Sequence, residues 1–445
     1  MNYYARLAAF SLSIAALTLL LLLIGPQANP LSLIAQTPTG EQAAPGAAIR
    51  VTFNRPVDRA STEASFQITP PIAGNFFWEE RTLSFVPAHV LQASTSYTVR
   101  FGPELRDAEG RPATDELSWS FQTRAPRLLV LRETPTGGSE LWLAELAGGA
   151  RQLLNSAEGI SEIAVSPDGN QVVYVEWRSN LRSVLMLLDL TSGAIQTLFD
   201  DPEASAAAPA WSPSGDMIAY ERQTLSAGGL GAPRLWLAQP DGTLLGPLVS
   251  GPEDRIARAP AWSPDGNRLA FLDAANEAVQ VYSFFSDTVT TLPASSREAP
   301  AWLPDGSALV YCEPIAGGPQ LRLALVTLGS EPVSRPLTDG NSEDAWLAVA
   351  PNGGAVAFHR REPTATSYGS HLWLVAILTG PAQPLTSSGP HQDVWPNWSP
   401  DGQQLAFIRV PEGQGASGAW AMRIDLNSRI ETPVLDRAIY VAWAP

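Results

Sequence analysis

A short word that recurs along most of the chain constrains its fold more than any other feature. In its fullest form the word reads Trp-Ser-Pro-Asp-Gly, and an apolar stretch follows each complete copy. Proline fixes φ at an early turn position, aspartate or asparagine bonds to the backbone ahead, and glycine accepts a positive φ. Each copy therefore predicts a tight turn between two strands. The copies are Val165–Gly169, Trp211–Gly215, Trp262–Gly266, Trp302–Gly306, Val349–Gly353, Trp398–Gly402 and the partial Trp443–Pro445.

The spacing of the word predicts a β-propeller. Successive prolines of the word lie 46, 51, 40, 47, 49 and 45 residues apart, close to the roughly 40–45 residues of a four-stranded blade. Before the first word lie three apolar stretches without an initial strand, and Ile439–Trp443 supplies a lone initial strand at the other end. Joining these two segments hides the edge strands of the ring. The sequence therefore predicts seven blades, one of them composite, or alternatively six.

The words and the strands after them resemble the WD-like propeller repeat of the TolB type over residues 127–445. This resemblance implies a propeller that acts in the periplasm, often through protein contacts, although the same blades also occur beside peptidase domains. Fold alone does not decide between such functions. The departures from the repeat are mild and fall at Val165, Ser214, Leu303, Val349, Asn352 and Ala444.

Residues 30–124 carry five short segments in which apolar and polar residues alternate. Short strands with such spacing favour an antiparallel sandwich. The stretches Val51–Asp58, Thr82–Phe101, Leu105–Pro112 and Trp119–Thr123 together resemble a bacterial Ig-like domain of the SbsA type, which implies a spacer or adhesion module of an envelope protein. The predicted fold class is therefore all-β, with strands at Ile49–Phe53, Phe66–Thr69, Thr82–Val86, Tyr97–Phe101 and Trp119–Thr123 before the propeller.

An uncharged apolar run fills residues 8–25, which is 18 residues and near the lower limit for a membrane-spanning helix. Arg6 precedes it and no basic residue follows until Arg50. The positive-inside rule then leaves residues 1–7 in the cytoplasm and the rest outside. We therefore expect a single-pass anchor in the cytoplasmic membrane, with secretion after signal cleavage as the alternative.

Composition excludes several function classes. The net charge is −16, and all 28 basic residues are arginine. Without lysine, neither a phosphate-loop nucleotide site nor a Schiff base can form, and an acidic chain is a poor nucleic-acid binder. Cys312 is the only cysteine, so it forms no disulfide within the chain, and we expect it to be a buried thiol.

The sequence offers little support for catalysis. It contains no G-x-S-x-G word, and His89, His359, His371 and His391 are scattered without an H-E-x-x-H word. We therefore expect no catalytic residues, no cofactor and no metal site. The alternative is an envelope glycan- or peptide-processing enzyme that uses the propeller mouth, with His391 and Asp393 as the best-placed groups.

A ligand would be expected on the face opposite the Pro-Asp-Gly turns. The long loops Gln223–Pro233, Arg361–Ser370 and Pro411–Gly418 fall on that side, and lengthened loops on one face are typical of binding surfaces. We expect an envelope protein or peptide as partner, with a glycan as the alternative. The sequence does not indicate an oligomeric state. The candidate ligand-binding residues are Arg258, Glu298, Asp344, Trp346, His391, Asp393, Trp395 and Arg437.

Overall fold

Antiparallel strands dominate the computed structural model, which describes residues 30–87, 91–178, 182–248, 256–316, 320–329, 331–362, 369–378 and 380–445. The predicted cytoplasmic segment 1–7 and membrane segment 8–25 lie outside these residues. Within the described ranges, no helix has the length and apolar character needed to cross a membrane. The all-β prediction for the two domains is confirmed.

The N-terminal part is a sandwich of two four-stranded sheets, in the orders β1-β3-β6-β5 and β2-β8-β7-β4. All five predicted strands are present. The structure adds a short helix, α2 (Arg59–Ser65), whose first turn is capped by the Asp58 carboxylate accepting from the Ser61 amide at 2.8 Å. The strands are β1 (Leu33–Thr37), β2 (Gly40–Ala43), β3 (Ile49–Phe53), β4 (Phe66–Thr69), β5 (Gly74–Glu79), β6 (Thr82–Pro87), β7 (Ser96–Phe101) and β8 (Leu117–Thr123).

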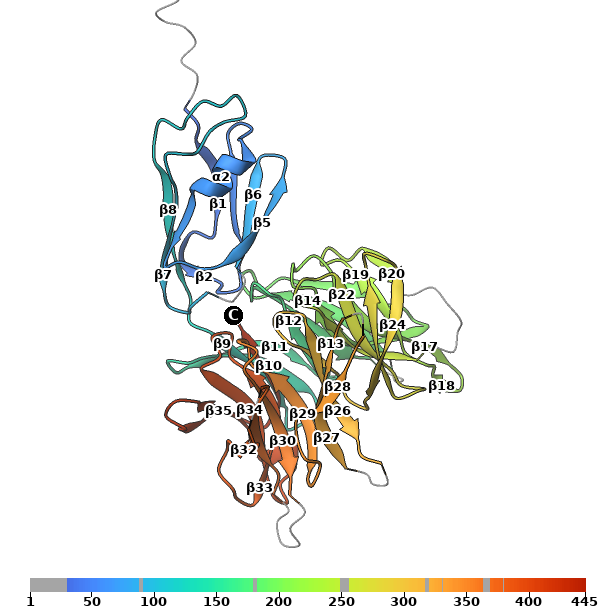
Figure 1. Cartoon of the computed structure of the whole chain (residues 1–445). Helices are drawn as coiled ribbons and strands as arrows, with labels where there is room; N and C mark the ends of the chain where they lie inside the picture. Colours follow the sequence, from blue (N-terminus) through green and yellow to red (C-terminus); the bar gives the residue numbers. More distant parts are fainter. Residues whose placement is uncertain are drawn as a thin grey trace, which may run out of the picture. The chain divides into compact units, whose positions relative to one another are not determined.

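Seven further sheets form the blades of a propeller (Figure 1). Six blades use consecutive strands, in the orders β12-β13-β14-β15, β16-β17-β19-β20 with β18 paired to β17, β21-β22-β23-β24, β25-β26-β27-β28, β29-β30-β31-β32 and β33-β34-β35-β36. The strand bounds from the second blade onward are β12 (Ile160–Val165), β13 (Gln171–Trp177), β14 (Ser183–Asp189), β15 (Ile195–Phe199), β16 (Ala204–Trp211), β17 (Ile218–Ser226), β18 (Gly229–Leu230), β19 (Arg234–Ala238), β20 (Leu244–Pro247), β21 (Ala257–Trp262), β22 (Arg268–Asp273), β23 (Ala278–Ser283), β24 (Thr288–Ser295), β25 (Ala301–Trp302), β26 (Ala308–Pro314), β27 (Leu321–Thr327), β28 (Ser334–Pro336), β29 (Glu343–Val349), β30 (Ala355–Arg361), β31 (His371–Ala376), β32 (Gln383–Pro384), β33 (His391–Trp398), β34 (Gln404–Pro411), the short 3-10 helix η1 (Ala416–Gly418), β35 (Trp420–Asp425) and β36 (Glu431–Asp436).

The remaining blade is composite, as the sequence predicts. Its order is β11-β10-β9-β37, built from β9 (Arg127–Glu133), β10 (Ser139–Glu145), β11 (Ala150–Ser156) and the distant β37 (Ala438–Ala444). Val441 faces Val130 across this antiparallel pair. Seven blades are therefore present, and the six-bladed alternative is wrong.

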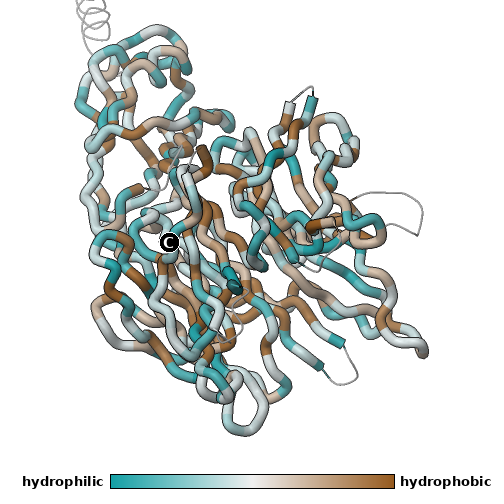
Figure 2. The backbone as a smooth tube through the Cα atoms, turned by 60° about the horizontal axis from the view of Figure 1, so that its bottom comes forward, coloured by the Kyte–Doolittle hydropathy of each residue, from teal (hydrophilic) through white to brown (hydrophobic). Residues whose placement is uncertain are grey.

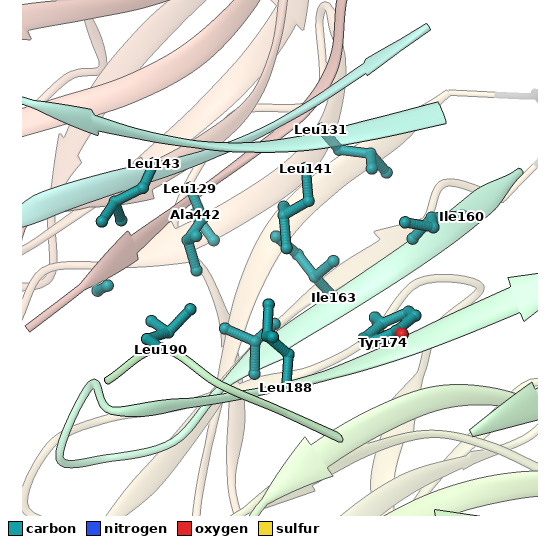
Figure 3. Packing of buried hydrophobic residues seen from close by; sticks show 12 residues of the cluster. Leu129, Leu131, Leu141, Leu143, Ile160, Ile163, Tyr174, Leu188, Leu190 and Ala442 are labelled. Atoms are coloured by element: carbon teal, nitrogen blue, oxygen red, sulfur yellow. The ribbon is translucent and has the colours of Figure 1, made fainter. Parts of the chain in front are cut away.

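Adjacent blades are held together by apolar side chains between their faces. Figure 3 shows one such layer, in which Leu141 and Leu143 of the composite blade lie near Ile163 and Leu188 of the next. Colouring by hydropathy shows hydrophobic segments along the propeller strands (Figure 2). Such layers bury apolar surface at roughly 25 cal/mol per Å².

The motif tryptophans also join blades. Trp262 donates its indole N–H to the Ala210 carbonyl of the previous blade at 3.1 Å, and Trp302 does the same to Ala261 at 2.8 Å. These tryptophans therefore serve packing between blades, and Trp262 is only 9% exposed. The turn chemistry is also as predicted, since the Asp265 carboxylate accepts from the Asn267 amide at 3.1 Å and Gly266 has φ of 70°.

Candidate functional site

The first strand of several blades carries a feature that the sequence did not predict. In these blades the strand is bulged, and the bulge places a non-glycine residue at positive φ. Such a backbone costs about 1–3 kcal/mol per residue and persists only where the surroundings impose it. The residues are Ala208, Ala259, Trp346 and Trp395, with φ of 48°, 53°, 47° and 53°.

Carboxylates from the preceding blade support these bulges. Glu221 accepts a hydrogen bond from the Ala259 amide at 2.8 Å, and Glu298 accepts one from the Trp346 amide at 2.8 Å. Glu162 supports the bulge of β16 in the same way. Burial raises the pKa of Glu162 and of Glu221. Glu298 therefore stabilises the backbone of the next blade through the Trp346 amide.

An aromatic cavity of about 360 Å³ lies among the first strands of four neighbouring blades. Glu298, Trp346, Trp395, Asn397 and Tyr440 contribute to its wall. The two indole rings lie 5.7 Å apart and remain 37% and 40% exposed. This volume is within the range of about 300–1,000 Å³ that small-ligand sites occupy.

The cavity arises from a difference between blades at one position. Three residues before the motif aromatic, or before the valine that replaces it, three blades carry a large ring, three carry a methyl group and one carries Glu162. Two of the rings, Trp346 and Trp395, were predicted from the sequence, whereas Tyr440 was not, although the same spacing could have revealed it. The large residues are Trp346, Trp395 and Tyr440, and the small ones are Ala208, Ala259 and Ala299.

A buried ion pair lies at the start of β29. The Asp344 carboxylate is 0% exposed and accepts two hydrogen bonds from Arg360, at 2.7 and 2.9 Å, and one from the Thr338 hydroxyl at 2.6 Å. Burial raises the pKa of Asp344, and its bonds to Arg360 and Thr338 oppose the rise. Asp344, predicted to contact a ligand, is therefore enclosed by its own blade.

The same arrangement recurs one blade later. Asp393 is also 0% exposed and accepts from Arg409 at 2.7 and 2.8 Å. Arg409 has a second partner here, Glu431, at 2.7 Å. Burial alone would raise the pKa of Asp393, but bonds from Arg409, His391 and Thr386 outweigh it and hold the pKa below its usual range.

Two histidines surround this second carboxylate. His371 and His391 are scattered in the sequence but meet in the fold, where their ring centroids lie 5.1 Å apart. His391 Nε2 lies 3.5 Å from Asp393 Oδ2, and His371 Nδ1 lies 4.0 Å from the same oxygen. Burial lowers the pKa of His371, which favours the neutral ring. His371 was not among the candidate site residues, because its 20-residue separation from His391 in the chain matches no local metal motif.

The eight candidate residues therefore do not form one group. Glu298, Trp346 and Trp395 meet at the cavity, and His391 and Asp393 meet in the histidine cluster. Arg258 is 57% exposed on β21 and lies 3.7 Å from Glu221. Asp344 and Arg437 also lie outside these groups: Asp344 is enclosed by Arg360, and Arg437 has positive φ and a buried Nε without a hydrogen-bond partner among the described residues.

Comparison with known proteins supports the assignment of both domains. The TolB beta propeller domain matches residues 121–376, and the bacterial Ig-like domain matches residues 27–123. A TolB homolog of Chlorobium luteolum is 27% identical over 155 residues, which are 35% of this chain and 33% of that protein. Dipeptidyl-peptidase 5 of Porphyromonas endodontalis is 23% identical over 292 residues, which are 58% of this chain and 38% of that protein. The chain thus spans less than half the length of these curated relatives.

Solved structures show the same propeller fold. A puromycin-hydrolyzing peptidase of Mycobacterium tuberculosis superposes with a TM-score of 0.54 at 16% identity, covering 70% of this chain and 54% of that one. At this identity the likeness concerns the fold alone. The family match extends over more than half of the sequence and over the repeats from which the blades are built, so the chain belongs to the TolB β-propeller family.

Proposed function

We propose that this protein binds a protein or peptide segment of the cell envelope at the aromatic cavity of its propeller, in a binding rather than a catalytic role. The Ig-like domain serves as a spacer, and residues 8–25 attach the chain to the cytoplasmic membrane with both domains on the extracytoplasmic side. Membership in the TolB family supports an envelope location and protein partners. The uncharged apolar run of residues 8–25 supports the anchor.

The pair of half-exposed tryptophans in the cavity carries this proposal. Tryptophan combines a large apolar ring with one N–H donor and is enriched at the centres of protein interfaces. Trp346 and Trp395 are held on strained bulges, and the Trp346 amide is fixed by Glu298. Packing of blades does not require large rings there, because other blades carry alanine at the equivalent position. A side chain inserted from a partner could stack on both rings.

Site-specific photo-crosslinking tests this proposal. A photoreactive phenylalanine derivative replaces Trp395 in the full chain, and the protein is irradiated with an envelope extract of the source organism. We expect a discrete crosslinked protein, identified by mass spectrometry, whose yield falls at least tenfold when Trp346→Ala is added.

The matched control places the same photoreactive group at Trp177, which is 37% exposed on a different blade. Equal crosslinking from positions 177 and 395 would overturn the proposal. Capture of a glycan instead of a protein at position 395 would reject a protein partner. Turnover of a glycan or peptide by the purified protein, abolished in His391→Ala, would favour an enzyme.

A further inference from the structure

We infer that His371, His391 and Asp393 form a binding site for one divalent transition-metal ion of the zinc class. The three residues come from β31 and β33, two consecutive blades of the propeller. Their candidate ligand atoms all lie within 4.8 Å of one another. This site does not depend on the function proposed for the aromatic cavity.

The distances suit a tetrahedral ion. Zinc binds imidazole nitrogen and carboxylate oxygen at about 2.0–2.2 Å, which separates neighbouring ligand atoms by about 3.4 Å. His391 Nε2 and Asp393 Oδ2 are 3.5 Å apart, and His371 Nδ1 is 4.0 Å from the same oxygen. Small rotations of the rings therefore suffice to bring all three atoms onto one ion.

The two nitrogens lack other hydrogen-bond partners. His371 Nδ1 and His391 Nε2 are both buried, and neither has a hydrogen-bond partner among the described residues other than the Asp393 carboxylate, which lies 4.0 and 3.5 Å away. A buried polar atom without a partner costs about 1–3 kcal/mol. A metal ion between the rings and the carboxylate would remove that cost for both nitrogens at once.

The repeat shows that these histidines are not needed to build the blade. Leu323 and Leu372 each donate their amide to a threonine hydroxyl at equivalent points, at 3.0 and 3.1 Å. The residue before each leucine is Arg322 in one blade and His371 in the next. Likewise, the residue two before the buried aspartate is Ser342 in the first case and His391 in the second. The Asp344 network thus forms completely without either histidine.

The surroundings also suit a cation. Arg409 is the positive charge that contacts Asp393, and it is shared between two carboxylates, Asp393 and Glu431. The cluster therefore carries no excess positive charge. Arg409 fixes the orientation of Asp393, as the supporting groups of metal ligands commonly do.

Two glycines leave room for the rings. A Cβ on Gly389 would lie 2.7 Å from Cε1 of His391, and a Cβ on Gly369 would lie 2.9 Å from Nε2 of His371. The imidazole rings thus occupy space that any larger residue at these positions would fill.

The donor set selects the metal class. Two imidazoles with one carboxylate suit zinc, nickel, copper or iron, whereas magnesium and calcium prefer oxygen ligands throughout. Three protein ligands leave at least one coordination position for water or another ligand. Zinc is the probe for the test.

Calorimetric titration of the full chain with Zn²⁺, after dialysis against a chelator, tests the inference. We expect one ion per chain with a micromolar or tighter Kd. His371→Ala and His391→Ala should each weaken binding by more than about 100-fold, since loss of a merely supporting group already costs about 10–100-fold. X-ray absorption of the zinc-loaded protein should show two imidazole ligands.

The matched control is Ser342→Ala, which changes the residue equivalent to His391 in the neighbouring blade and should leave zinc binding unchanged. Thermal unfolding in chelator confirms that each variant is folded, and His391→Asn provides a second variant of similar shape. Absence of zinc binding to the unmodified protein, or full retention of binding in both histidine variants, would overturn the inference.

Discussion

The buried aspartates of two consecutive blades have the same partner but different neighbours. Asp344 and Asp393 are each bound by an arginine one strand away, through two hydrogen bonds. Around Asp344 the enclosure is complete, and Arg360 has no second carboxylate among its ion pairs in the described part of the chain. Around Asp393 the arginine is shared with Glu431, and two histidines approach Oδ2 of the carboxylate.

This difference distinguishes the residues that stabilise the blade from the residues that form a candidate binding site. An element that recurs with the repeat serves the blade, as the aspartate–arginine pair does in both copies. A group that occurs in one copy only is not required by the repeat, and its chemistry needs another explanation. The same reasoning applies to the first strands, where alanine suffices in three blades and large rings line the cavity in three others.

The largest expected effect is the loss of Asp344. Asp344→Ala leaves Arg360 only 9% exposed and without its carboxylate, and an unpaired buried charge typically costs about 3–5 kcal/mol. Urea unfolding followed by tryptophan fluorescence should show this decrease in the free energy of unfolding. A decrease below about 1 kcal/mol would mean that the network does not stabilise its blade.

Asp393→Ala should cost less, about 1–3 kcal/mol, because Arg409 keeps a charged partner in Glu431. The same urea measurement compares the two variants directly, without added metal. Equal losses from the two aspartates would contradict the distinction drawn between their networks.

Moving the histidines to the first network sharpens the comparison. The double variant Arg322→His, Ser342→His should remain within about 1 kcal/mol of the unmodified protein, because the pair lost between Arg322 and Glu313 is partly exposed. Equilibrium dialysis should then show two zinc ions per chain. Stoichiometry that stays at one would show that the Asp344 network cannot accept an ion even with both rings present.

The smallest expected effect comes from Gly389→Ala. The added methyl group displaces the His391 ring. Zinc affinity should fall only about tenfold, because the displaced ring can still bind the ion in a less favourable position. Gly329→Ala, where a Cβ would have no neighbour within 4 Å, is the control for calorimetry. Unchanged affinity in Gly389→Ala would show that the ring position does not control binding.

Much of the fold could be predicted because its determinants are local and repeated. The Pro-Asp-Gly turn depends on residues within one short word, and Gly266 takes the left-handed conformation that such a turn requires. Repetition then gave the blade length, and the unmatched strands at either end gave the composite blade. The bulges were not predictable in this way, since the positive φ of Ala259 is supported by Glu221 from another blade.

In the candidate site too, the residues in repeated positions could be predicted and the contacts between distant strands could not. Trp346 and Trp395 could be predicted because they occupy a fixed place in the repeat, and the same spacing would have identified Tyr440. By itself the sequence determined an all-β chain with a sandwich and a closed ring of blades. Only the tertiary structure decided that Asp344 is enclosed by Arg360 while Asp393 meets His371 and His391, because these contacts join strands whose spacing in the chain carries no local signal.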